Sequence, residues 1–184
     1  MKYIIYTFAF LLISGFLSAQ DIEKPKKPKK LLKNAEKFMK SGDVYSAIDN
    51  YEDYVDMVED DYVIANRLGE AYLLARDYLK AESTFKRIFD ADPENYRKAQ
   101  YFHSLCMMHT ATTEIDKQDS DADQSQREML LQEAIGKYEE AKKNFKTFSK
   151  KYRGSDKSAY KKKVKMQTQT LNPILQTREY TVAI

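Results

Sequence analysis

Apolar and small residues recur along this chain at a fixed distance of 34 residues. Four positions in one stretch have counterparts in the next (69 − 35 = 34): Ala35, Phe38, Ala47 and Tyr51 return as Gly69, Tyr72, Ala81 and Phe85. Within each copy these residues have helical three-to-four spacing, so each copy predicts two helices. We place them near residues 30–40 and 44–59 in the first copy, and near 61–75 and 78–90 in the second. Between them lie turn-forming stretches, Ser41-Gly42-Asp43 and Arg76-Asp77.

The small and aromatic positions of the pattern have a packing role. A small residue allows two helices to approach closely, and Ala35, Gly69 and Ser104 occupy equivalent places. A second small residue one turn before an aromatic predicts that the aromatic fills the gap between neighbouring helices. The pairs are Ala47/Tyr51, Ala81/Phe85 and, further along, Ala141/Phe145.

A third unit opens near Tyr96 and then departs from the pattern. Tyr72 and Ala81 are nine positions apart, whereas the corresponding Met107 and Ala141 are 34 apart (141 − 107), so about 25 residues are inserted, at about 110–127. Beyond the insertion, apolar spacing favours one long helix over residues 126–150, although Gly136 leaves open a separate helix over 128–135. We expect a capping helix within 155–176, ended by Pro173, and an unassigned tail over 177–184.

The second copy resembles the tetratricopeptide repeat. It reads Leu68-Gly69-x-x-Tyr72, then Ala81-x-x-x-Phe85, then Pro93, and differs from the repeat signature at the leading aromatic, where Ala65 stands. The resemblance implies an all-α fold, a right-handed superhelical stack of helix-turn-helix (TPR) repeats with a C-terminal capping helix. Residues 31–154 would form three such repeats.

A narrower resemblance concerns envelope proteins of Bacteroidota. The stretches at 31–38 and 99–102, behind a leader ending Ser-Ala-Gln, are similar to the N-terminal TPR module of OmpA-type envelope proteins, some associated with type IX secretion and gliding motility. No OmpA-like domain follows here, so peptidoglycan binding is not carried over. The chain is either a stand-alone adaptor or the front of a longer polypeptide.

The first 20 residues have the features of a secretory signal peptide. Lys2 precedes an apolar stretch from Tyr3 to Leu17 and small residues at its end, with cleavage after Ala19 or after Gln20. A membrane anchor is the alternative, but the apolar stretch is shorter than the roughly 20 residues that a spanning helix needs. We expect a periplasmic protein, with association with the outer membrane as an open alternative.

Charge is unevenly distributed along the chain. The net charge of +3 becomes +2 without Lys2 (3 − 1), but residues 21–30 form a basic Pro/Lys linker, 49–61 are acidic and 150–165 are basic again. The linker is expected to be a solubilising spacer, or else a peripheral contact with membrane or cell wall. Nucleic acid is not an expected partner of an exported chain.

No catalytic or cofactor-binding constellation is evident, and we expect neither an enzyme nor a cofactor. His103 and His109 are six residues apart and so do not share a helix face, which disfavours a metal site. Asp119-Ser-Asp121-Ala-Asp123 begins like a calcium loop, but lacks the glycine and the glutamate that such a loop needs. Cys106, the only cysteine, lies among apolar residues and is expected to be buried.

Binding of a protein or peptide partner is therefore the expected function, with the chain acting as a scaffold or adaptor in the cell envelope. The first helices of stacked repeats line a concave groove. The residues expected there are Leu32, Glu36, Met39, Asn66, Glu70, Leu73, Leu74, Tyr101, Leu105, Met108 and His109. The alternatives are that several of them pack against the insertion or the C-terminal segment, and that the protein is a structural tether with basic ends.

Overall fold

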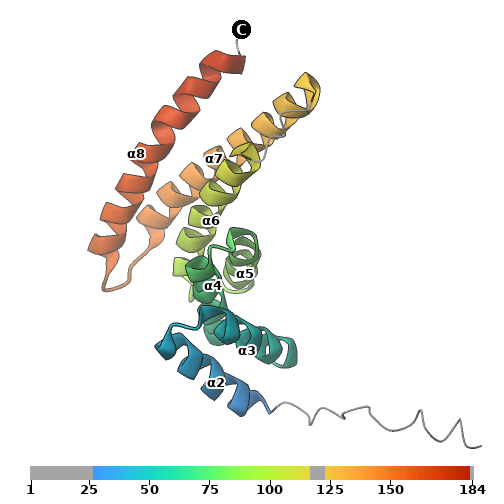
Figure 1. Ribbon diagram of the computed structural model, residues 1–184. Coiled ribbons are helices and arrows are strands. Elements are labelled where there is room, and N and C mark those ends of the chain that lie inside the picture. Colours follow the sequence, from blue (N-terminus) through green and yellow to red (C-terminus); the bar gives the residue numbers. More distant parts are fainter. Residues whose placement is uncertain (1–26, 117–122, 183–184) are drawn as a thin grey trace, which may run out of the picture.

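The computed structural model describes residues 27–116 and 123–182, and all regular secondary structure in these ranges is helical. Each helix packs mainly on the next one along the chain (Figure 1), so the all-α prediction is confirmed. No helix among them is long and apolar enough to cross a membrane. The predicted signal peptide lies outside the described residues. The helices are α2 (Pro28–Ser41), α3 (Val44–Met57), α4 (Tyr62–Ala75), α5 (Tyr78–Ala91), α6 (Arg97–Asp116), α7 (Gln124–Lys151) and α8 (Lys157–Val182).

The two copies of the sequence pattern form helix pairs with the same bounds. Helix α4 begins and ends 34 residues after α2 (62 − 28 and 75 − 41), and α5 does so after α3 (78 − 44 and 91 − 57). Their caps repeat as well, because the equivalent Asp43 and Asp77 accept hydrogen bonds from the backbone N–H groups of Ser46 and Lys80, each at 3.1 Å. These bonds satisfy N–H groups that have no partner within the helix. The same local chemistry thus sets the starts of α3 and α5, whereas α4 has a side-chain cap from Asp61 and α2 has none.

The core consists of two clusters that meet along α6. The first cluster joins α2 to α5 with Ala99 and Cys106 of α6, and the second joins α6, α7 and α8. The predicted small–aromatic pairs are buried in them: Ala47, Ala81 and Ala141 are fully buried, as are Phe85 and Phe145, and Tyr51 is 3% exposed. The packing role inferred for these residues is confirmed.

Helix α7 is a single helix of 28 residues that runs through Gly136. The favoured alternative is therefore confirmed, and the separate helix over 128–135 is wrong. A Cβ added at Gly136 would meet no atom within 4 Å, so this glycine stands on the open side of α7. The predicted insertion is helical at both ends, since α6 extends to Asp116 and α7 begins at Gln124. Residues 117–122, which hold most of the calcium-like stretch, lie outside the described residues.

Helix α8 runs through Pro173 and ends at Val182, so the predicted end of the capping helix at Pro173 and the separate tail over 177–184 are wrong. A proline inside a helix removes one N–H donor and costs about 3 kcal/mol. Leu171 and Leu175 flank this proline, are 0% and 9% exposed, and belong to the second core cluster. Burial of a leucine contributes about 1.5–3 kcal/mol, which offsets the proline and continues the helix.

Candidate functional site

Two of the eleven predicted groove residues are buried rather than presented on a surface. Tyr101 is 3% exposed and Met108 is 8% exposed. The ring centroid of Tyr101 lies 5.4 Å from that of Phe145 on α7 and 5.0 Å from that of Tyr160 on α8. Helices α7 and α8 cover this side of α6, so the expectation that these two residues line an open groove is wrong.

Five further groove residues are engaged in packing or stacking. Leu32, Met39 and Leu73 are partly buried against the first cluster, and Leu105 is partly buried against the second. The ring of His109 stacks on Tyr78 at the start of α5, with centroids 4.2 Å apart and planes 11° apart. His109 thus faces α5. The alternative that several predicted groove residues pack against the C-terminal segment holds for Tyr101, Leu105 and Met108, which belong to the second cluster.

The accessible remainder of the predicted groove is mainly polar. Glu36 of α2 accepts a hydrogen bond from Arg67 of α4 at 2.6 Å, which joins the two first helices. On α4 itself, the side-chain amide of Asn66 donates to Glu70 at 2.9 Å. Leu74, at the end of the same helix, is 63% exposed. The structure therefore leaves a charged and amide-bearing surface on α2 and α4.

Asn66 and Glu70 lie at the wall of a cavity of about 560 Å³. Helix α4 forms one wall, the start of α6 forms another, and the turn between α7 and α8 closes the end. The cavity mixes apolar, aromatic, amide and charged side chains. Its lining includes Val63, Asn66 and Glu70 from α4, Asn95 and Tyr96 before α6, Lys98 and Phe102 from α6, and Tyr152, Arg153 and Tyr160 near the turn. We call this cavity the α4–α6 pocket.

An ion pair joins Lys98 of the α4–α6 pocket to Asp156 in the turn between α7 and α8. Lys98 Nζ lies 2.6 Å from Asp156 Oδ2 and 5.3 Å from the centroid of the Tyr160 ring. The Tyr152 hydroxyl donates to the other oxygen of the same carboxylate. The hydrogen bond to Asp156 raises the pKa of Lys98 to about 12, and the same bond, with that from Tyr152, lowers the pKa of Asp156. Both groups are therefore charged at neutral pH.

Sequence reasoning missed Lys98, Tyr152 and Tyr160 as parts of a site. Lys98 and Asp156 are 58 positions apart, so neither helical spacing nor the 34-residue period relates them. The one available signal is the stretch from Arg153 to Asp156, whose glycine and aspartate are typical of the end of one helix and the start of the next.

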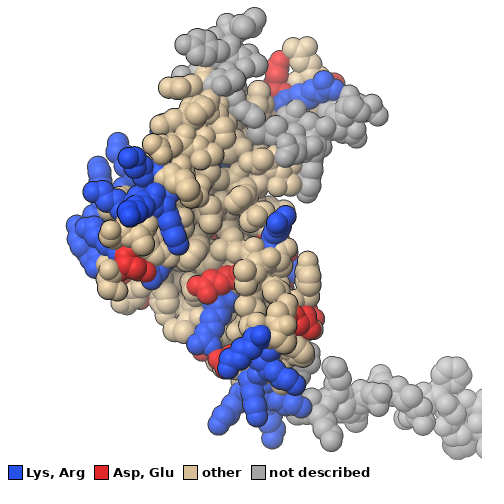
Figure 2. Space-filling model, turned by 60° about the vertical axis from the view of Figure 1, so that its left-hand side comes forward, with Lys and Arg blue, Asp and Glu red and all other residues tan. Residues whose placement is uncertain are grey.

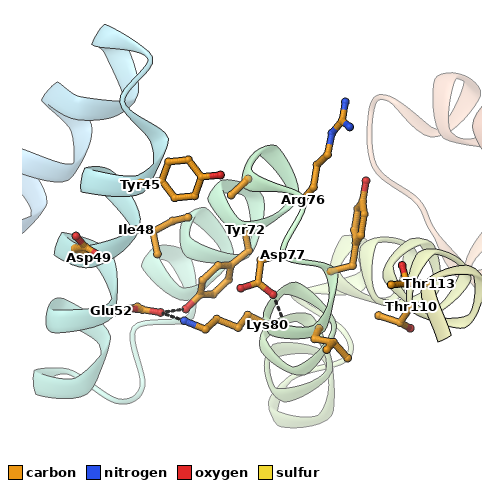
Figure 3. Close-up of a pocket in the computed structure, with 13 residues that line it drawn as sticks. Tyr45, Ile48, Asp49, Glu52, Tyr72, Arg76, Asp77, Lys80, Thr110 and Thr113 are labelled. Atoms are coloured by element: carbon orange, nitrogen blue, oxygen red, sulfur yellow. Dashed lines mark hydrogen bonds and ion pairs between the residues drawn. The ribbon is translucent and has the colours of Figure 1, made fainter. Parts of the chain in front are cut away.

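A second cavity, of about 540 Å³, lies between α3, the α4–α5 turn and the second half of α6 (Figure 3). At its centre Glu52 accepts hydrogen bonds from the Tyr72 hydroxyl and from Lys80 Nζ, the latter at 2.8 Å. Burial, followed by the bond to Glu52, raises the pKa of Tyr72 above its usual range. The second cavity is also lined by two exposed apolar side chains, Tyr45 and Leu79, which occupy equivalent repeat positions (79 − 45 = 34). None of the eleven predicted groove residues lines it.

The described residues contain no group of three or more histidine, cysteine or acidic side chains placed to hold a metal ion. Cys106 is fully buried, as predicted, and burial raises the pKa of its thiol to about 12. Burial likewise lowers the pKa of His103, which is 7% exposed. These groups are thus held in the neutral form within the core.

The fold and the cavities define an all-helical chain of consecutively packed helices, in which α2–α3 and α4–α5 are copies of one unit. Comparison with known proteins finds no matching family model and no match among curated proteins.

Proposed function

We propose that the chain is an exported scaffold of the tetratricopeptide-repeat type that binds a segment of a protein partner in the α4–α6 pocket. The repeated bounds of α2–α3 and α4–α5 support the repeat assignment. The superhelical stacking, the periplasmic location, and a place in an outer-membrane-associated secretion or motility complex rest on the sequence resemblance and the leader.

The observation that carries the proposal is that the α4–α6 pocket lies between α4 and the start of α6, which the repeat interpretation assigns as the first helices of the second and third units. In stacked repeats these helices line the face that receives ligands. The side-chain amides of Asn66 and Asn95 donate one N–H each, to Glu70 and Asp92, and Arg153 donates to backbone carbonyls through one guanidinium nitrogen. Each side chain has further N–H groups that could donate to the carbonyl groups of a bound peptide. Val63, which is 54% exposed, and the partly buried Phe102 offer apolar contact for one anchoring side chain. The lining suits a short peptide segment with one apolar anchor.

The test is photocrosslinking in living cells of the source organism, with a photoreactive residue at Val63 and, as the matched control, at Tyr45 in the second cavity. Both positions are exposed, at 54% and 71%, so both can carry the probe without disturbing the core. We expect a partner protein to crosslink at Val63 and not at Tyr45. A Val63→Glu variant should lose at least about tenfold in capture, because a charge would replace the apolar contact.

Crosslinking at Tyr45 alone would move the site to the second cavity and contradict the proposal. Equal capture by Val63→Glu and the parent chain, at unchanged helical content, would do the same. Circular dichroism of each variant provides the control for folding.

A structural tether to anionic lipid or cell wall is the second candidate. It is favoured by the exposed Lys27, Lys29, Lys30 and Lys33 around the start of α2. Such a tether should sediment with anionic vesicles or with sacculi at low salt and be released at high salt, because exposed charges are screened over about 10 Å at 0.1 M salt. A Lys29→Glu/Lys33→Glu variant should abolish that sedimentation.

A further inference from the structure

The C-terminal part of the described chain carries a concentrated positive charge. Residues 141–176 contain ten lysines and one arginine but a single acidic residue, a net charge of +10 (11 − 1). That acidic residue, Asp156, is already paired with Lys98. In the space-filling view, lysine and arginine side chains gather in two places, one on the left-hand side of the molecule and one at its lower end (Figure 2).

Six of these lysines line a single groove of about 950 Å³ between α7 and α8. Three of them follow each other at intervals of four along α7 and three belong to α8: Lys142, Lys146 and Lys150, and Lys161, Lys162 and Lys165. No acidic side chain is among the lining residues. Within the described part of the chain, none of the six forms an ion pair with a carboxylate. We call this feature the lysine groove.

The floor of the lysine groove is not charged. Val164, Ser149 and Thr168 lie between the lysines of the two walls, and Val164 is 7% exposed. The hydroxyl of Thr168 donates to the Val164 carbonyl at 2.8 Å, so it is not directed to a ligand. Lysine side chains add apolar alkyl stems below their ammonium groups. The base of the groove is therefore uncharged, with apolar contact from Val164 and the lysine stems beside the hydroxyl groups of Ser149 and Thr168, and both rims are positively charged.

We propose that the lysine groove binds an acidic amphipathic segment of a partner protein. The segment would lie along the groove, with its carboxylates against the two rows of lysines and its apolar side chains on the floor. The two-walled shape favours a chain-like ligand, because a flat membrane surface would meet only the rims. The uncharged floor favours a polypeptide over a bare polyanion, which could use the ammonium groups but not the base of the groove.

This second binding surface is separate from the α4–α6 pocket. The two cavities share no lining residue, and Lys98 lines only the pocket. Loss of one binding activity should therefore leave the other intact, and the two proposals can fail independently.

Fluorescence anisotropy with the full chain tests the proposal directly. The probe is a labelled 18-residue helical peptide with leucine on one face and glutamate on the other. We expect saturable binding that weakens with rising salt, as for any contact between exposed charges. A Lys146→Glu/Lys162→Glu variant, which reverses one exposed charge on each wall, should lower the affinity at least about tenfold.

The matched control reverses two exposed lysines elsewhere. Lys29→Glu/Lys33→Glu makes the same change in net charge on α2, outside the groove, and should change the affinity less than about twofold, since only the weak long-range field is altered. The Val63→Glu variant of the α4–α6 pocket should likewise bind the peptide normally. A photoreactive residue at Ser149 should crosslink to the peptide.

Three outcomes would overturn the proposal. Equal affinity for polyglutamate of the same length would show simple ion exchange rather than recognition of an amphipathic segment. Equal effects of the groove and control variants would show that net charge alone attracts the peptide. In the third outcome, the parent chain would bind no peptide but would sediment with phosphatidylglycerol vesicles. If the groove variant abolished that sedimentation, the lysines would be assigned to a membrane surface instead.

Discussion

Gly69 of α4 lies directly against the ring of Phe85 on α5: a Cβ added at Gly69 would lie 2.7 Å from Phe85 Cζ. The Phe85 ring is fully buried and also stacks on Phe102, with centroids 5.1 Å apart, so it has little freedom to retreat. We expect Gly69→Ala to lower the free energy of unfolding by up to about 2 kcal/mol, because overpacking costs about 1–3 kcal/mol and the gain in helix propensity is only about 1 kcal/mol. Urea denaturation measures the difference.

Gly136 provides the matched control for that prediction. It also lies within a helix, but a methyl group there would meet no atom within 4 Å. Gly136→Ala should therefore gain the higher helix propensity of alanine without any steric cost. We expect it to raise the free energy of unfolding by about 0.5–1 kcal/mol. If both substitutions stabilised the protein, the close contact between Gly69 and Phe85 would be contradicted.

Arg76 has a left-handed backbone, with φ of 61°, at the position where the first repeat has Gly42, with φ of 81°. Its side chain points away from the cluster of Glu52, Tyr72 and Lys80 (Figure 3). We expect Arg76→Gly to raise the free energy of unfolding by about 0.5–1 kcal/mol, since glycine adopts this conformation without a steric cost. Chemical denaturation is the measurement.

The reciprocal change at the equivalent turn is the control. Gly42→Ala introduces a Cβ into the same left-handed backbone and should lower the free energy of unfolding by about 1 kcal/mol. A destabilising Arg76→Gly substitution would indicate that the arginine side chain makes a contact that outweighs its backbone cost.

The sequence was sufficient to predict those parts of the fold that depend on local chemistry. Small–aromatic spacing predicted the contact of Gly69 with its partner helix, and Asp43 and Asp77 marked helix starts because an aspartate cap acts within three residues. The result is that α2 to α5 begin and end within two residues of their predicted limits.

The candidate site was less predictable because it depends on contacts that are distant in the sequence. Tyr101 has the spacing of a groove residue on α6, and only the way in which α7 and α8 fold back over it makes it core. Lys98 forms its ion pair with Asp156 because the same folding back of α7 and α8 brings the turn between them to α6. Pro173 was predicted to end a helix because proline is costly inside one. The burial of Leu171 and Leu175, which outweighs that cost, depends on tertiary packing and is not visible in the local sequence.

The Lys98–Asp156 pair predicts a pH-dependent contribution to stability. The pKa of Asp156 is lowered in the folded state, so its contribution is present above the ordinary aspartate pKa and is lost as the pH falls through the folded value. The pKa of Lys98 is raised to about 12, so its contribution is lost only as the pH rises through that value. Asp156→Asn should therefore lower the midpoint of urea denaturation at pH 7.

The difference between the parent chain and Asp156→Asn should shrink as the pH falls below the ordinary aspartate pKa, and vanish below the lowered pKa of folded Asp156, where both side chains are neutral. The control is Asp90→Asn, which removes the carboxylate of an exposed pair with Lys86 within α5. It should have a smaller effect at pH 7, because its two partners belong to the same helix and join no separate elements. A difference that persisted unchanged in acid would assign the effect of Asp156→Asn to something other than its charge.

Cys106 can report on the opening of the core around α6. Its side chain is fully buried, and burial raises the pKa of the thiol to about 12. At pH 8 roughly one thiol in 10⁴ would be ionised in the folded state, and reagents that attack the thiolate cannot reach it until the helices separate. We expect labelling by a disulfide reagent at least about a thousandfold slower than for an exposed cysteine. A Cys106→Ser/Ser41→Cys variant, whose single thiol lies at the exposed end of α2, provides that reference rate.

The same labelling reaction can be followed at increasing urea concentrations. If the first cluster opens only when the whole protein unfolds, labelling should accelerate over the same urea range in which the helix signal is lost. If α6 separates from α5 on its own, labelling should accelerate at lower urea concentrations. Rapid labelling in the absence of urea would contradict the burial of Cys106 between these helices.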